Sequence, residues 1–327
     1  MTDIDLDAVR AAADTLFAPD AEHGTSLALV VLHGGQVAFE RYGTQPDTVF
    51  GPGGPVGPDD TLVSWSMAKS ITHAAVGILV DEGRLDTAAP APVPAWIGTD
   101  KEAITLQQLL EMRSGLLFVE DYVDGSVSHV IEMLFGEGKD DVAGYAAGLP
   151  LAHEPGTVWN YSSGTSNIVA RIVGDAVGGG REGMEVFLHD RLFGPVGMTS
   201  AIPKFDAAGT FIGSSYVYAT ARDFARFGEL YRNDGVTADG TRVLPAGWRD
   251  HARTWAATDP DGEFDYGAHW WLWRDHPGSL ACHGYEGQYT VVVPDRELVV
   301  VHLGKVDAAL RPLVNAQLRR IIAAVGA

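Results

Sequence analysis

The chain has 327 residues, of which 46% are hydrophobic and 20% charged, a composition typical of a globular protein with one large domain or two closely packed ones. Its net charge of −20 argues against a nucleic-acid partner, because an acidic surface repels phosphate. Cys282 is the only cysteine, so an intrachain disulfide and a cysteine-based zinc site are excluded. We expect no membrane span and no secretory signal, since no stretch approaches the ~20 apolar residues that a span needs. A cytoplasmic protein is the simplest prediction, although a mature form that has lost its signal would look the same.

The first part of the chain predicts one helix and one hairpin. Residues 5–17 carry apolar side chains at helical spacing. A β-rich run at 26–33 and an alternating run at 36–42 are separated by Gly34 and Gly35. Two such runs around a glycine pair are typical of antiparallel strands joined by a tight turn.

A second helix is predicted to begin at a serine–lysine pair. A glycine- and proline-rich loop at 50–60 leads to Ser66 and Lys69, and an apolar run at 71–79 ends near Gly83. Positions three apart share one face of a helix, so the Lys69 ammonium can reach the Ser66 hydroxyl. A hydroxyl is a weak nucleophile unless a neighbour takes its proton, and S-x-x-K supplies that neighbour within one turn.

Helical patterns dominate the middle of the chain, from 85 to 199. A proline-rich segment at 89–96 interrupts them, and Thr105 is a suitable N-cap for the helix that follows. The predicted helices of this part are 104–112, 128–134, 142–147, 167–177 and 184–193.

Strand patterns return near the C-terminus. The runs 289–294 and 297–302 predict an antiparallel hairpin, preceded by a helix at 220–231 and a strand at 269–273 and followed by a helix at 308–325. Strands at both ends with helices between them predict an α/β (α+β) fold. In this fold an antiparallel sheet flanked by helices is built from residues 1–84 and 200–327, and residues 85–199 form an all-helical inserted domain.

Other common functional motifs are missing or lie in the wrong context. G-x-S-x-G and H-E-x-x-H do not occur. A G-x-G-x-x-G at residues 178–183 follows a helical pattern instead of a strand, so it predicts a helix end and a turn, not a dinucleotide site. We expect neither a cofactor nor a metal ion.

Several stretches read together resemble one known family. They are Ser66-Met67-Ala68-Lys69, Ile104-Thr105-Leu106, Trp159-Asn160-Tyr161-Ser162-Ser163, Gly194-Pro195-Val196-Gly197-Met198, Ala219-Thr220-Ala221-Arg222-Asp223 and His283-Gly284-Tyr285-Glu286-Gly287-Gln288. In this order the chain is similar to the serine β-lactamase-related superfamily, which includes class C β-lactamases, penicillin-binding DD-peptidases, family VIII carboxylesterases and nylon-oligomer (6-aminohexanoate-dimer) hydrolases. The stretch from 213 to 220 is most similar to the nylon-hydrolase-like branch. The resemblance implies a sheet domain and a helical domain with the active site in the cleft between them.

The resemblance also implies catalytic roles. Ser66 matches the acylated serine, Lys69 the motif lysine and Tyr161 the tyrosine of the Y-x-N element. A phenol with a pKa near 10 is a base at neutral pH only if cations lower that pKa. Lys69 could do so, and Tyr161 would then take the Ser66 proton and later deliver it to the leaving group.

Two elements depart from the lactamase pattern. Ser163 replaces the asparagine of Y-x-N, which puts tight β-lactam recognition in doubt. Where lactamases have K-T-G, this chain has Cys282-His283-Gly284. Gly284 matches the motif glycine, and the Tyr285 and Ser66 amides would form the oxyanion hole. His283, whose charge would change near neutral pH, is expected to bind substrate or Tyr161, and Ser163, Gly284 and Tyr216 are the other expected substrate contacts.

The predicted function is that of a serine hydrolase acting through an acyl-enzyme on small carboxylic esters or short linear amides, with weak or no β-lactamase activity. The alternatives are acyl transfer or D-amino-acid peptidase chemistry on the same fold, or a non-catalytic binding protein. The loops at 50–60 and 119–128 are expected to choose the substrate, and the sequence does not indicate the oligomeric state.

Overall fold

Strands from the two ends of the chain form one antiparallel sheet. The computed structural model describes residues 3–19, 22, 24–48, 51–121 and 127–326. The sheet has eight strands in the order β2-β1-β13-β12-β11-β10-β9-β8. The first strand along the chain, β1, pairs with the last, β13, with Val30 opposite Val301. The strands are β1 (Thr25–His33), β2 (Gln36–Tyr42), β8 (Ala257–Thr258), β9 (Phe264–Tyr266), β10 (Trp271–Trp273), β11 (Leu280–Gly284), β12 (Gln288–Val293) and β13 (Leu298–Lys305). This confirms the predicted fold class.

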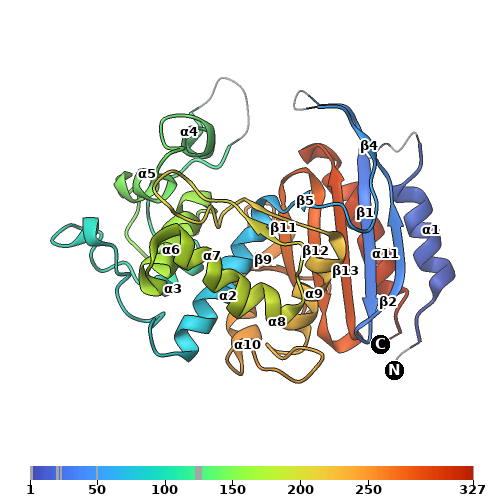
Figure 1. Ribbon diagram of the computed structural model, residues 1–327. Coiled ribbons are helices and arrows are strands. Elements are labelled where there is room, and N and C mark those ends of the chain that lie inside the picture. The colour runs from blue at the N-terminus through green and yellow to red at the C-terminus, as the bar shows by residue number, and fades with distance from the viewer. Residues whose placement is uncertain (1–2, 20–21, 23, 49–50, 122–126, 327) are drawn as a thin grey trace.

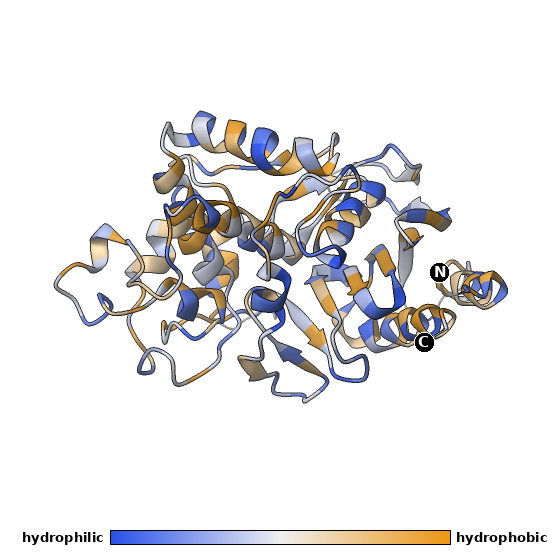
Figure 2. Ribbon diagram, turned by 90° about the horizontal axis from the view of Figure 1, so that it is seen from below, coloured by the Kyte–Doolittle hydropathy of each residue, from blue (hydrophilic) through white to orange (hydrophobic). Residues whose placement is uncertain are grey.

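The central strands are apolar because both faces of the sheet are covered. Side chains alternate along β1, so Val30 packs into one core and Val31 into the other. Helices α1 (Leu6–Leu16) and α11 (Arg311–Ala323) cover the Val31 face, whereas α2 (Ala68–Asp81) and α9 (Ala221–Arg232) belong to the other core (Figure 1). Figure 2 shows α1 and α11 side by side at the edge of the molecule, with both termini next to them.

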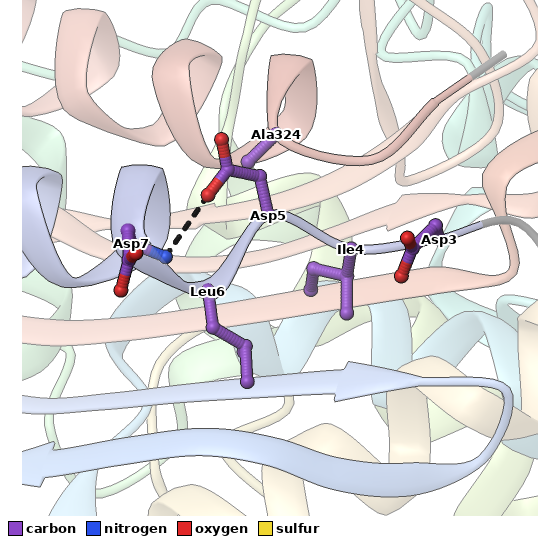
Figure 3. A pocket seen from close by; sticks show the side chains of 6 residues that line it. All are labelled: Asp3, Ile4, Asp5, Leu6, Asp7 and Ala324. Carbon is purple, nitrogen blue, oxygen red and sulfur yellow. Dashed lines mark hydrogen bonds between the residues drawn. The ribbon is translucent and has the colours of Figure 1, made fainter.

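The first helix begins at a capping aspartate. The Asp5 carboxylate accepts a hydrogen bond from the Asp7 amide at 3.0 Å (Figure 3) and another from the Ala8 amide, also at 3.0 Å. The Asp5 amide donates to the Ala324 carbonyl at 2.8 Å, which holds the start of the chain against its last helix.

The middle of the chain is helical, as predicted. Thr105 and Gln108 form a capping box at its first helix. Gly178, with φ of 77°, ends α6, so the glycine-rich motif at 178–183 is a turn between helices. The helices are α3 (Leu106–Leu110), α4 (His129–Phe135), α5 (Val142–Gly148), α6 (Ser163–Val177), α7 (Gly180–Phe187), a π-helical turn (Leu188–Phe193) and α8 (Gly194–Val196). The domain boundaries at 84/85 and 199/200 stay a prediction.

Several short strands and one short helix were not predicted, because their sequences show no recognisable pattern. A three-stranded sheet joins β5 (Leu62–Val63), β7 (Val217–Ala219) and β6 (Ile202–Pro203), and β3 (Thr44–Gln45) pairs with β4 (Gly54–Pro55). Helix α10 (Trp248–Arg253) is also unpredicted. The strand expected at 269–273 begins only at Trp271, because His269 has a left-handed φ of 58° that a strand cannot contain. In the described residues, no helix has the length and apolar character needed to cross a membrane.

Candidate active site

A cleft of about 740 Å³ contains the predicted nucleophile. Ser66 and Tyr161 line it, together with Glu120 from the segment between α3 and α4 and Gly284 at the end of β11. The loops at 50–60 and 119–128, which the sequence predicts to choose the substrate, are described only in part, since residues 50 and 122–126 lie outside the described part of the chain.

The Lys69 ammonium sits between the nucleophile and two further oxygens. A short 3₁₀ turn (Trp65–Met67) leads into α2, which places Lys69 one turn after Ser66. Its Nζ lies 3.0 Å from Ser66 Oγ, 2.9 Å from Ser163 Oγ and 2.9 Å from the Ser214 carbonyl oxygen. Only 2% of Lys69 is exposed, so these three oxygens supply its hydrogen bonds.

A carboxylate that the sequence did not reveal fixes the direction of this network. Glu120 accepts hydrogen bonds from the Ser163 amide at 2.7 Å and the Ser163 hydroxyl at 2.6 Å. Since the Ser163 hydroxyl donates to Glu120, it can only accept from Lys69, and the Ser214 carbonyl is likewise an acceptor. A neutral Lys69 amine therefore spends its two N–H groups on Ser163 and Ser214, and its lone pair faces the Ser66 hydroxyl.

Burial acts in opposite directions on Lys69 and Tyr161. It lowers the pKa of Lys69 to about 8, and the Glu120 charge opposes this shift. It raises the pKa of Tyr161 well above 10; Glu120 adds to that rise, and hydrogen bonds to Ser66 and Trp271 offset only part of it. Lys69 Nζ lies 4.9 Å from the centre of the Tyr161 ring, so the ammonium faces the ring.

The expected lowering of the Tyr161 pKa by Lys69 is therefore wrong. The phenol stays protonated at neutral pH, whereas about one Lys69 in ten is neutral at pH 7 with a pKa near 8. Of the two groups, Lys69 is the one able to accept the Ser66 proton.

Gly284 and Tyr285 bring the end of β11 against the nucleophile turn. A Cβ atom at Gly284 would lie 2.5 Å from the Ser64 carbonyl oxygen, so only glycine allows this approach. Gly284, Tyr285 and Ser66 all line the cleft. The oxyanion hole formed by the Ser66 and Tyr285 amides stays a prediction.

His283 lines the cleft as a neutral imidazole. The Trp273 indole N–H donates to His283 Nε2 at 2.9 Å, which requires that nitrogen to be unprotonated. Burial, with added repulsion from Arg311 and Arg319, holds the pKa of His283 well below its usual range. The expectation that its charge changes near neutral pH is corrected, because the ring is held neutral between aromatic neighbours such as Trp271, 5.2 Å away and nearly parallel.

Ser163 and Tyr216 do not line the described walls of the cleft, although both are expected substrate contacts. Ser163 is fully buried behind Lys69. Tyr216 packs on Trp65, the residue before Ser66, with ring centres 5.6 Å apart. Both residues therefore support the catalytic groups instead of facing the cleft.

A second pocket and the metal-binding residue types of the described chain offer no comparable chemistry. The pocket at the start of α1 is lined by aliphatic groups and three aspartates and contains no nucleophile (Figure 3). No group of three or more histidine, cysteine, aspartate or glutamate side chains among the described residues is arranged to hold a metal ion.

A serine, a lysine and a tyrosine brought together between an antiparallel sheet and a helical region define the serine hydrolases of β-lactamase fold. The chain belongs to the beta-lactamase family, whose model matches residues 13–319.

The proteins and solved structures that the chain resembles are named for different activities. The 6-aminohexanoate-dimer hydrolase of Paenarthrobacter ureafaciens is 29% identical over 295 residues, which cover 84% of this chain and 71% of that protein. A family VIII carboxylesterase structure has a TM-score of 0.72 at 16% identity and covers 98% of this chain and 96% of its own. The simvastatin synthase structure of Aspergillus terreus has a TM-score of 0.73 at 15% identity, and the match covers 97% of this chain and 98% of that one. At these identities the two structures establish the fold alone.

Proposed function

We propose that this protein is a serine hydrolase that forms an acyl-enzyme on Ser66 and acts on small carboxylic esters or short linear amides. The observation that carries the proposal is the arrangement around Lys69. Two of its three hydrogen-bond partners can only accept, so in the neutral state its lone pair faces Ser66 Oγ at 3.0 Å.

The proposed reaction proceeds in two halves. Lys69 takes the Ser66 proton while Oγ bonds to the substrate carbonyl carbon, and the amides of Ser66 and Tyr285 stabilise the oxyanion. The carbon–oxygen or carbon–nitrogen bond then breaks, and the protonated Tyr161, resupplied from Lys69, gives the leaving group its proton. Water adds to the acyl-enzyme by the same steps in reverse, which releases the acid and restores Ser66.

The walls of the cleft favour an apolar acyl group. Trp159, Phe264 and Trp271 line it, and a flat aromatic wall suits a short alkyl or aromatic chain. The relative from Paenarthrobacter is named for an amide substrate and the family VIII structure for esters, so both bond types are candidates.

Weak or absent β-lactamase activity is part of the proposal. Where lactamases carry the K-T-G lysine, this chain has Cys282, and His283, at the next position of the motif, is held neutral by Trp273. A lactam carboxylate would find no cation at that position.

The first test replaces the nucleophile. Ser66→Ala should lower kcat for p-nitrophenyl butyrate by about 10⁴-fold or more, because the acyl-enzyme cannot form. Ser70 lies one helical turn after Ser66, and its buried hydroxyl donates to the His269 carbonyl. Ser70→Ala, as a control, should keep most of the activity. A fluorophosphonate should add once, on the peptide containing Ser66. Retained turnover in Ser66→Ala, or labelling elsewhere, would remove Ser66 as the nucleophile.

The alternatives give different outcomes in the same assays. An acyl transferase would divert product to an added alcohol or amine. A D-amino-acid peptidase would cleave D-aminoacyl amides faster than simple esters. A non-catalytic binding protein would show neither turnover nor an adduct. A cytoplasmic location and a small molecule as the only partner stay predictions from the sequence.

A further inference from the structure

Two residues beside the predicted oxyanion hole have strained backbones. Trp65, directly before Ser66, has φ of 42°, and Glu286, directly after Tyr285, has φ of 60°. Residues with a side chain rarely adopt this left-handed region, and such strain persists only where the surroundings impose it. The strain therefore marks both segments that carry the two amide donors.

The two strained residues are bonded to each other. The Trp65 indole N–H donates to Glu286 Oε2 at 3.1 Å, although the residues lie 221 positions apart. Lys305 Nζ donates to the same oxygen at 3.0 Å. The Trp65 ring also meets the Tyr285 ring edge-on, with centres 5.9 Å apart. A charged acceptor shared by two donors in a partly buried place is a strong hydrogen-bonding centre.

Backbone and side-chain hydrogen bonds also anchor the Tyr285–Gly287 turn to the sheet. Gln288 Nε2 donates to the Tyr285 carbonyl at 3.0 Å, and the Val306 amide donates to the Glu286 carbonyl at 3.1 Å. The Glu286 side chain thus ties this anchored turn to the segment before Ser66.

We propose that Glu286 is a positioning residue that sets the spacing of the oxyanion hole by binding Trp65. This inference rests on the proposed function. Oxyanion donors must lie about 2.7–3.1 Å from the developing charge. If the turn at Ser66 and the turn at Tyr285 move slightly apart, the enzyme therefore loses more binding energy toward the transition state than toward the bound substrate. Loss of the link should therefore lower kcat and leave KM nearly unchanged.

The test compares removal of the carboxylate with a conservative change. Glu286→Ala should lower kcat for p-nitrophenyl butyrate about 10- to 100-fold, with KM within about threefold of the wild type. Glu286→Gln keeps an oxygen that can accept from Trp65, and its kcat should stay within about threefold. Trp65→Phe keeps a ring against Tyr285 but removes the donor, so it should resemble Glu286→Ala. The double variant should lose no more than either single one, because both remove the same bond.

A matched control separates positioning from general stability. The Glu40 side chain is 28% exposed and that of Glu286 26%. Glu40 lies on β2 and binds Arg222 of α9, and neither residue lines the cleft. Glu40→Ala should lower Tm without changing kcat.

Wild-type kcat in Glu286→Ala, equal loss in Glu286→Gln and Glu286→Ala, or additive losses in the double variant would each overturn the positioning role. If Glu286→Ala does not fold, Trp65→Phe decides alone, since an unchanged kcat there contradicts the proposal. Failure of the proposed function looks different, because the wild type itself would then show no turnover and no Ser66 adduct.

Discussion

The chemistry of the cleft depends on which of two residues can exist as a base. Burial brings the pKa of the cationic Lys69 down toward neutrality and moves that of the phenolic Tyr161 further away. In the proposed reaction, burial therefore favours the amine as proton acceptor and the phenol as proton donor.

The pH dependence of activity follows from this selection. Because only neutral Lys69 can accept the Ser66 proton, kcat/KM for a short ester should rise about tenfold per pH unit below 8 and level off above it. Rates measured between pH 5.5 and 9.5 check this. Lys69→Met should be inactive throughout, whereas a profile that rises only near pH 10 would point to Tyr161 instead.

Glu120 should determine the pH at which kcat/KM rises. Its charge raises the pKa of Lys69, so Glu120→Gln should lower that pKa and shift the rise to lower pH. The glutamine oxygen can still accept from Ser163, but the plateau should fall several-fold because its amide group cannot accept both bonds. Glu132→Gln, at an exposed position on α4, should leave the profile unchanged. An unshifted rise in Glu120→Gln would show that Glu120 does not act on Lys69.

At the scale of elements, a buried chain of hydrogen bonds holds the nucleophile helix in place. His73 on α2 bonds Tyr231 on α9 at 2.7 Å and His251 on α10 at 3.0 Å, and His251 bonds Gln107 on α3 at 2.8 Å. The Gln107 amide N–H₂ donates to Glu111, so its oxygen faces His251 and must accept.

The Gln107 oxygen, as an obligatory acceptor, fixes the position of every proton in this series of hydrogen bonds. His251 Nε2 donates to Gln107, so its Nδ1 accepts from His73 Nε2, and His73 Nδ1 accepts from Tyr231. A proton added at His251 Nδ1 would face the N–H of His73 Nε2. This agrees with burial lowering the pKa of His251 to about 4 and that of His73 well below its usual range.

The fold should therefore be sensitive to acid. Between about pH 6.5 and 4 the unfolded chain binds protons at these histidines and the folded chain does not, so the free energy of unfolding falls as pH falls. Each such histidine contributes up to about 1.4 kcal/mol per pH unit. Urea unfolding of His251→Gln should show a shallower decline than the wild type, and His189→Gln, at an exposed position, should not. Equal slopes in all three would contradict the proton assignment.

At the scale of the whole molecule, the sequence predicted the local patterns of strands, helices and helix caps. It did not predict contacts between residues that lie far apart in the chain. The sheet was predictable because short apolar runs rich in β-branched residues, such as 26–33 and 297–302, are bounded by turn residues. Ser66 and Lys69 were predictable because one helical turn joins them. Glu120 was not, since a single carboxylate in a loop carries no periodic signal, and neither was the contact between Trp65 and Glu286. The direction of the Tyr161 shift depends on burial, which one tyrosine in a sequence does not reveal.

The overall charge should also select among substrates. Glu120, Asp259, Asp261 and Glu263 line the cleft, against Arg311, in a chain of net charge −20. Fields of one sign in a cleft raise the local concentration of oppositely charged ligands, and salt screens them over about 10 Å at 0.1 M and 3 Å at 1 M.

We therefore expect a cationic ester to be hydrolysed with a higher kcat/KM than an anionic ester of the same acyl group, by about tenfold at 10 mM salt. The difference should shrink to about twofold at 1 M salt, because screening removes the attraction and leaves the contacts within the site. Asp261→Asn, which removes one negative charge from the wall, should narrow the low-salt difference without changing kcat for a neutral ester. A preference for the anionic ester at low salt would mean that Arg311 dominates the field, since it is the opposing charge on the described walls of the cleft.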